Sequence, residues 1–155
     1  MYTKILVPLD GSELAECVLP QVEAITTGCQ VSTVEFVRVA EPIEILDGES
    51  RLALNEEQWR QFEKNRITDA EQYLAQLVQR LDFKGAQLET KVLIGKAADT
   101  LADYADKNDF DLIVIATHGR SGISRWVWGS VAERILRSAC VPVLMVRAPG
   151  CVIGT

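Results

Sequence analysis

Short apolar segments alternate with amphipathic helical patterns along the chain, and this alternation restricts the fold more than any other feature. Two segments, 5–9 (Ile-Leu-Val-Pro-Leu) and 112–116 (Leu-Ile-Val-Ile-Ala), are apolar throughout, which is typical of strands buried on both faces of a parallel sheet. Three further strands are predicted at 30–40, 88–94 and 141–147, and helices at 12–28, 56–81, 98–107 and 130–139. The order predicts a single-domain α/β protein over residues 1–155, a five-stranded, doubly wound parallel sheet with helices on both faces.

The first helical pattern is predicted to start at Ser12, whose hydroxyl is a natural N-cap, and to end at Gly28. Leu14, Val18 and Val22 recur on one face of this helix. Pro20 stands inside the pattern, and a proline in a helix interior removes a backbone donor. The sequence therefore predicts a helix that is kinked at Pro20.

Two predicted strands end in residues suited to ligand binding. Asp10 follows the first apolar segment, and residues 117–122 (Thr-His-Gly-Arg-Ser-Gly) follow the segment 112–116. A doubly wound sheet binds ligands beyond the carboxyl ends of its strands, where the winding direction switches. If these two strands are neighbours at the switch, Asp10 and the glycine loop face the same crevice.

The glycine loop leads to Gly129 and to a helical pattern that starts at Ser130. A strand, a glycine loop and a helix N-terminus in succession form a cradle for anions, because backbone N–H groups and the helix dipole favour negative charge. The alternative is that these glycines serve only tight turns. The residues alone leave both interpretations open.

Spacing excludes two common phosphate-binding motifs. A P-loop ending at Gly95 and Lys96 needs a glycine at position 90 and a Ser or Thr at position 97, where the chain has Thr90 and Ala97. A dinucleotide fingerprint needs Gly-x-Gly-x-x-Gly after the first strand, where the chain reads Pro-Leu-Asp-Gly-Ser. Gly95 is therefore interpreted as a turn at the end of a strand.

Asp10 has two compatible interpretations. Its carboxylate can accept hydrogen bonds from ribose hydroxyls, or it can cap the first helix together with Ser12. His118 is the single histidine of the chain, and no nucleophile, base and orienting group are recognisable around it. It is interpreted as a ligand contact or as a loop residue satisfied by local hydrogen bonds, and no catalytic residue is predicted.

Composition disfavours several classes of function. A net charge of −6 argues against nucleic acid and anionic membranes as partners. No apolar stretch approaches the roughly 18 residues of a membrane span, and no signal peptide is recognisable. The four cysteines lack CxxC spacing, so a zinc site is not predicted and the expected compartment is the reducing cytoplasm.

Four motifs together resemble those of the universal stress protein family. They are 4–12 (Lys-Ile-Leu-Val-Pro-Leu-Asp-Gly-Ser), 117–119 (Thr-His-Gly), the spacing Gly119-x9-Gly129-Ser130, and 141–146 (Val-Pro-Val-Leu-Met-Val). The resemblance covers nearly the whole chain. It implies a Rossmann-like fold similar to that of adenine nucleotide alpha hydrolases.

The nucleotide-binding branch of that family carries the motif Gly-x2-Gly-x9-Gly-(Ser/Thr). Ala116 stands where the motif has its first glycine, so the resemblance implies binding that is weakened or slightly shifted rather than lost. Asp10 matches the acid at the ribose, and Val39 matches the residue beside adenine. The candidate nucleotide-binding residues are Pro8, Leu9, Asp10, Val39, Ala116, His118, Gly119, Arg120, Gly122, Gly129, Ser130 and Val131.

The resemblance therefore implies a cytoplasmic stress-response regulatory protein that binds ATP or AMP, with Mg²⁺ as a companion of ATP. The family pairs subunits through its last strand, and the strand from Val141 to Val146 is an apolar edge that a monomer would leave open. A homodimer without enzymatic turnover is expected. Two alternatives stay open: a stress protein that binds no nucleotide and acts through protein contacts, and a slow ATP-hydrolysing or adenylating enzyme of the same architecture.

Overall fold

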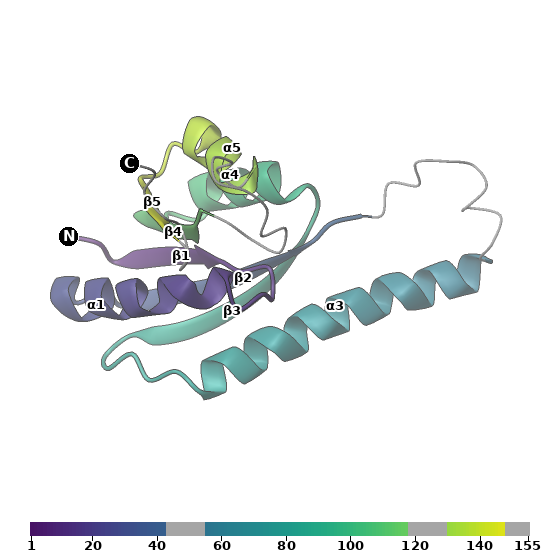
Figure 1. Cartoon of the computed structure of the whole chain (residues 1–155), viewed down its shortest axis with the longest axis horizontal. Helices are drawn as coiled ribbons and strands as arrows, with labels where there is room; N and C mark the ends of the chain where they lie inside the picture. Colours follow the sequence, from purple (N-terminus) through teal and green to yellow (C-terminus); the bar gives the residue numbers. More distant parts are fainter. Residues whose placement is uncertain (43–54, 118–129, 148–155) are drawn as a thin grey trace, which may run out of the picture.

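The computed structural model describes residues 1–42, 55–117 and 130–147 and contains one five-stranded sheet (Figure 1). All strand pairs are parallel, and the strand order is β3-β2-β1-β4-β5. Helices α1 and α3 cover one face of the sheet, and α4 and α5 cover the other. The predicted doubly wound parallel sheet is confirmed.

The two fully apolar segments form the centre of the sheet. The strands are β1 (Lys4–Pro8), β2 (Thr33–Ala40), β3 (Gln87–Ile94), β4 (Leu112–Ala116) and β5 (Val143–Val146). The helices are the 3₁₀ helix η1 (Ala15–Val18), then α1 (Leu19–Cys29), α3 (Glu56–Gln79), α4 (Ala97–Lys107) and α5 (Ser130–Ser138). β1 and β4 pair with each other and are buried along almost their whole length, as expected for strands covered by helices on both faces.

Alternate residues of the central strands enter two separate cores. Ile5, Val7 and Val114 face η1, α1 and α3, where they pack with Phe36 and Leu74. The residues between them face α4 and α5 on the opposite side of the sheet; this second core contains Leu6, Val37, Leu101, Ile113, Ile115 and Ile135. The period of two along each strand therefore places one helix pair on each face.

The first helix differs from the prediction, because Pro20 causes no kink. It is the second residue of α1, and the preceding turn is the separate 3₁₀ helix η1. The first N–H groups of a helix have no intrahelical partner, so a proline fits there without losing a hydrogen bond. The helix also runs one residue beyond Gly28 and ends at Cys29, and its C-cap residue Gln30 adopts a left-handed conformation with φ of 54°.

The last strand begins later than predicted, at Val143 rather than at position 141. Pro142 has no N–H to donate to a ladder, and its carbonyl accepts a hydrogen bond from the N–H of Ile113 at 2.9 Å. β5 lies at the edge of the sheet, as predicted from this proline. Among the described helices, none has both the length and the apolar character needed to cross a bilayer.

Candidate functional site

The carboxyl ends of β1 and β4 form the switch point of the sheet. The two strands are neighbours, but β1 is followed by β2 on one side and β4 is followed by β5 on the other. Asp10 comes two residues after β1, and Ala116 is the last residue of β4. The prediction that these two strands flank the switch is confirmed, and ligand sites of doubly wound sheets lie at this place.

Residues 9–14, here called the Asp10 loop, connect β1 to η1. The Asp10 carboxylate accepts hydrogen bonds from the Ser12 backbone N–H at 2.9 Å and from the Ser12 hydroxyl at 2.6 Å, both through Oδ1. Ser12 Oγ in turn accepts a hydrogen bond from the N–H of Ala15 at 3.2 Å. Ser12 therefore binds the first residue of η1, although Leu14 holds the N-cap position, and the same serine orients the carboxylate of Asp10.

Four other candidate residues lie at this end of the sheet and have little exposed side chain. Pro8, Leu9 and Ala116 are buried, and Val39 is half-buried against the core beneath α4 and α5. Leu9 packs with η1 and α1, and its N–H donates to the carbonyl of Val37 at 2.8 Å. These four residues form an apolar surface at the switch point, and Asp10 adds a charged group to it.

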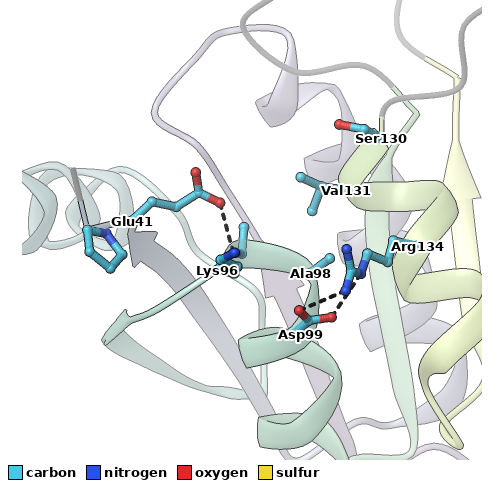
Figure 2. A pocket seen from close by; sticks show the side chains of 9 residues that line it. Glu41, Lys96, Ala98, Asp99, Ser130, Val131 and Arg134 are labelled. Carbon is cyan, nitrogen blue, oxygen red and sulfur yellow. Dashed lines mark hydrogen bonds and ion pairs between the residues drawn. The ribbon is translucent and has the colours of Figure 1, made fainter. Parts of the chain in front are cut away.

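A hollow of about 370 Å³ lies nearby, between the ends of β2 and β3 and the first residues of α4 and α5 (Figure 2). Two candidate residues, Ser130 and Val131, line it. The other described lining residues are Glu41, Pro42, Lys96, Ala97, Ala98, Asp99 and Arg134. Asp10 is not among them, so the described residues place the two halves of the predicted site at one end of the sheet but not in one cavity.

Opposite charges line this hollow in pairs. Arg134 binds Asp99 through two parallel contacts, Nε to Oδ1 and Nη2 to Oδ2, each 2.9 Å long. Glu41 Oε1 accepts a hydrogen bond from the N–H of Ala97 at 2.8 Å and so caps α4 with a negative charge, as Figure 2 shows. The hollow therefore offers both cationic and anionic groups to a polar ligand.

Seven of the nine described lining residues were not predicted as site residues, and three of them could have been found from the sequence. Glu41 directly follows β2, and Lys96 comes two residues after β3, so the strand-end rule could have indicated both. Arg134 comes four residues after Ser130, which places it on the same side of α5. The four-residue helical spacing from Ser130 could therefore have indicated Arg134 from the sequence.

Five candidate residues lie outside the described residues: His118, Gly119, Arg120, Gly122 and Gly129. The anion cradle that they are predicted to form remains a prediction. In the described part of the chain, no three His, Cys, Asp or Glu side chains gather as a metal site would need.

Known proteins resemble the chain over most of its length. The profile described as the Universal stress protein family matches residues 1–147. Universal stress protein MJ0531 of Methanocaldococcus jannaschii is 29% identical over 96% of this chain and 84% of its own length. The solved structure of protein MJ0577 from the same organism aligns with a TM-score of 0.78 at 26% identity, covering 97% of this chain and 99% of that one. A family member from Arabidopsis thaliana, solved with AMP bound, aligns with a TM-score of 0.66 at 15% identity, covering 96% and 93% of the two chains.

Proposed function

The chain belongs to the universal stress protein family, and we propose that it is a cytoplasmic regulatory protein that binds an adenine nucleotide and acts as a homodimer. Members of this family are generally regulatory or binding proteins. We propose further that residues 1–155 form one domain and that binding, rather than turnover, carries the function. A nucleotide then acts through its different affinities for the states of the protein.

The position of the Asp10 carboxylate carries this proposal. It lies at the switch point of a doubly wound sheet, where this architecture binds ligands, and Ser12 holds it in a defined orientation. A carboxylate accepts hydrogen bonds from the two hydroxyls of a ribose, and charge-assisted bonds of this type are stronger than neutral ones. The AMP-bound relative from Arabidopsis thaliana supports an adenine nucleotide as the ligand.

Ser130 and Val131 supply the proposed contacts to phosphate. They are the first two residues of α5, and both line the hollow that Lys96 and Arg134 also line. Helix N-termini favour anions because their backbone N–H groups point outward and the dipole is positive there. We propose that the chain binds ATP or AMP, with Mg²⁺ accompanying ATP.

Calorimetric titration with ATP and AMP tests the proposal. Asp10→Ala removes a charge-assisted acceptor and is expected to weaken binding by roughly 10-fold to 100-fold. Ser130→Ala is expected to have a smaller effect, because only its hydroxyl is lost. Asp103→Ala is the matched control, since Asp103 is an exposed carboxylate that pairs with Lys107 on α4. Unchanged ATP and AMP affinities in the Asp10 and Ser130 variants would refute the assignment.

The proposed dimer uses the edge strand β5. Its outer side is apolar, and Leu144 is 37% exposed there. An unpaired apolar edge strand favours pairing with another strand. We expect light scattering to show a dimeric wild type and a Leu144→Lys variant that is shifted toward the monomer. A concentration of about 100 μM is well above typical dimer Kd values. A wild type that is monomeric at this concentration would exclude the interface.

The absence of turnover is tested by single-turnover measurement with ATP. Phosphoryl transfer requires a positioned base and charge-stabilising groups, and the sequence indicates no such set. The expected hydrolysis rate is well below about 1 per second, the lower end of typical turnover. A faster rate would assign an enzymatic function instead.

A further inference from the structure

The Asp10 loop is fixed from outside the nucleotide site by side chains of β2 and α3. Tyr73 of α3 donates its hydroxyl to Glu16 Oε1 of η1 at 2.9 Å, and Arg80, the C-cap residue of α3, binds Glu16 Oε2 at 2.5 Å. Arg38 of β2 lies with its guanidinium carbon 5.2 Å from the centre of the Tyr73 ring, a cation–π contact. These four residues, Arg38, Tyr73, Arg80 and Glu16, are here called the α3 clamp.

Arg38 also limits which residue can stand next to Asp10. Gly11 has a φ of 85°, a conformation that favours glycine, and a methyl group there would lie 3.0 Å from the Arg38 guanidinium carbon. The backbone of the Asp10 loop therefore packs directly against the guanidinium. A larger residue at position 11 would be strained at this φ and would displace the Arg38 guanidinium from its place against the loop.

Three contacts connect the Asp10 loop and the start of η1 to β2 and α3. The N–H of Leu9 is bound to Val37 at the start of the loop, Gly11 meets Arg38 in its middle, and Glu16 is held by Tyr73 just after its end. Ser12, which donates two hydrogen bonds to the Asp10 carboxylate, belongs to the same loop. A displacement of the loop would therefore move the carboxylate and Ser12 together.

Tyr73 is chemically suited to a permanent contact. Burial, and then the hydrogen bond to Glu16, raise the pKa of its hydroxyl well above the ordinary value for tyrosine. The hydroxyl therefore remains a donor throughout the physiological pH range. The link between α3 and η1 does not switch with modest changes of pH.

We propose that Arg38 and Tyr73 are positioning residues of the nucleotide site, holding the Asp10 loop from β2 and α3 so that the Asp10 carboxylate meets the ribose hydroxyls. The proposal rests on the proposed function of Asp10. Neither residue needs to touch the ligand. Because coupling between two equilibria is reciprocal, a nucleotide bound through Asp10 also stabilises the packing of α3 on the loop.

Two nucleotides and two variants test the proposal. The probes are ATP and 2′,3′-dideoxy-ATP, which lacks the hydroxyls that Asp10 would bind, and the readout is the ratio of their Kd values by calorimetry. Arg38→Met and Tyr73→Phe are each expected to weaken ATP by roughly threefold to tenfold, the range of one modest polar contact, with dideoxy-ATP unchanged. If a variant weakens the binding of ATP and of dideoxy-ATP equally, the residue has a merely structural role. If neither Kd changes, the residue has no role in binding. Either result overturns the proposal.

Tyr104→Phe is the matched control, because Tyr104 also donates to a glutamate, Glu35, at 2.7 Å, but on α4 and away from the Asp10 loop. It should leave the ratio at the wild-type value. Asp10→Ala separates the two hypotheses: if wild type binds neither nucleotide, or if Asp10→Ala leaves the ratio intact, the proposed function itself fails. If wild type and Asp10→Ala behave as expected and the clamp variants do not, only the positioning role fails.

Hydrogen exchange on the wild type keeps the proposal testable if a clamp variant does not fold. ATP is expected to slow amide exchange in residues 70–79 of α3, none of which is a candidate ligand contact. Dideoxy-ATP at equal saturation should have a smaller effect. The same protection with both nucleotides, or no protection with either, would contradict the coupling.

Discussion

Two clusters of the same chemistry lie at opposite ends of the strands, and only one of them adjoins the proposed site. At the carboxyl end, Tyr73 donates to Glu16; at the amino end, Tyr104 donates to Glu35. A cation accompanies each carboxylate, and an aromatic ring faces a cation in both clusters. Chemistry alone therefore does not distinguish a cluster that supports a ligand site from one that supports the core.

The difference lies in what each cluster joins. Glu35 belongs to β2 itself, and only 7% of its side chain is exposed, so the amino-end cluster connects α4 to the interior of the sheet. Glu16 belongs to η1 and has a more exposed side chain, at 16%, so the carboxyl-end cluster connects α3 to a loop. Loops at the carboxyl ends of parallel strands carry the ligands in this architecture. We therefore assign stability to the amino-end cluster and loop positioning to the carboxyl-end cluster.

Removing the two glutamates should give the largest difference between the clusters. Glu35→Ala leaves the Tyr104 hydroxyl and the Lys4 ammonium without their buried partner, and we expect the free energy of unfolding to fall by about 2–3 kcal/mol. Glu16→Ala should cost about 1 kcal/mol, because Arg80 is 56% exposed and is hydrated when unpaired. Urea denaturation gives both values.

Nucleotide affinity should show the reverse order. Glu35→Ala is expected to leave the Kd for ATP within about twofold of wild type, whereas Glu16→Ala should weaken ATP by several fold, of the order of one polar contact. A Glu35 variant that binds ATP as poorly as the Glu16 variant would remove the distinction between the clusters.

The sequence predicted the central fold because it follows from local composition. The segment 5–9, which supplies most of β1, and the segment 112–116, which forms β4, are apolar at every position, and strands of this kind need helices on both faces. Pro20 was misjudged for a physical reason: hydrophobic spacing ran across it, and spacing alone does not reveal that the α-helix starts one residue before the proline. Gly95 was interpreted correctly as a turn, since its φ is 148°.

The candidate site was predictable only where chain position determines it. Asp10 comes two residues after β1, so its place at the sheet end could be derived from the sequence. The bond between Tyr73 and Glu16 joins residues 57 positions apart, and no local pattern indicates it. Lys96 follows a strand as Asp10 does, but it was passed over because the P-loop spacing around it failed.

High pH offers a second, smaller test of the two tyrosines. Burial, and then the hydrogen bond to the glutamate, raise the pKa of both Tyr73 and Tyr104 well above the ordinary tyrosine value. A raised pKa means that the folded protein keeps a proton that the unfolded chain loses, so this stability is present below pH 10 and is lost as the pH rises above it. Between pH 10 and 11 we expect a loss of up to about 1 kcal/mol per tyrosine, reduced by solvent screening.

Phenylalanine variants separate the two contributions. Tyr104→Phe and Tyr73→Phe should each be less stable than wild type at pH 8, and the difference should narrow by pH 11 in urea denaturation. If the stability difference between wild type and variant narrows for Tyr104→Phe alone, Glu16 does not hold the Tyr73 hydroxyl in solution, and the case for the clamp is weakened. If the difference narrows for both variants, the two tyrosines form equivalent hydrogen bonds with different roles.

The smallest expected effect concerns Asp111, which fixes the start of β1 at the amino end. Its Oδ2 accepts hydrogen bonds from the N–H groups of Lys4 at 2.8 Å and Thr3 at 2.7 Å, and these bonds lower the pKa of the carboxyl below its ordinary value of 3.8. A lowered pKa gives stability that is present above pH 3.8 and is lost as the pH falls through the folded value. Asp111→Asn should therefore cost about 0.5 kcal/mol at pH 7, since the carboxylate is partly exposed to solvent, and the cost should vanish near pH 2. A cost that stays constant across this range would mean that the carboxylate charge adds nothing. Of the two carboxylates discussed at the amino end, only Glu35 would then contribute electrostatic stability. The contrast between the Glu35 cluster and the Glu16 cluster would become sharper.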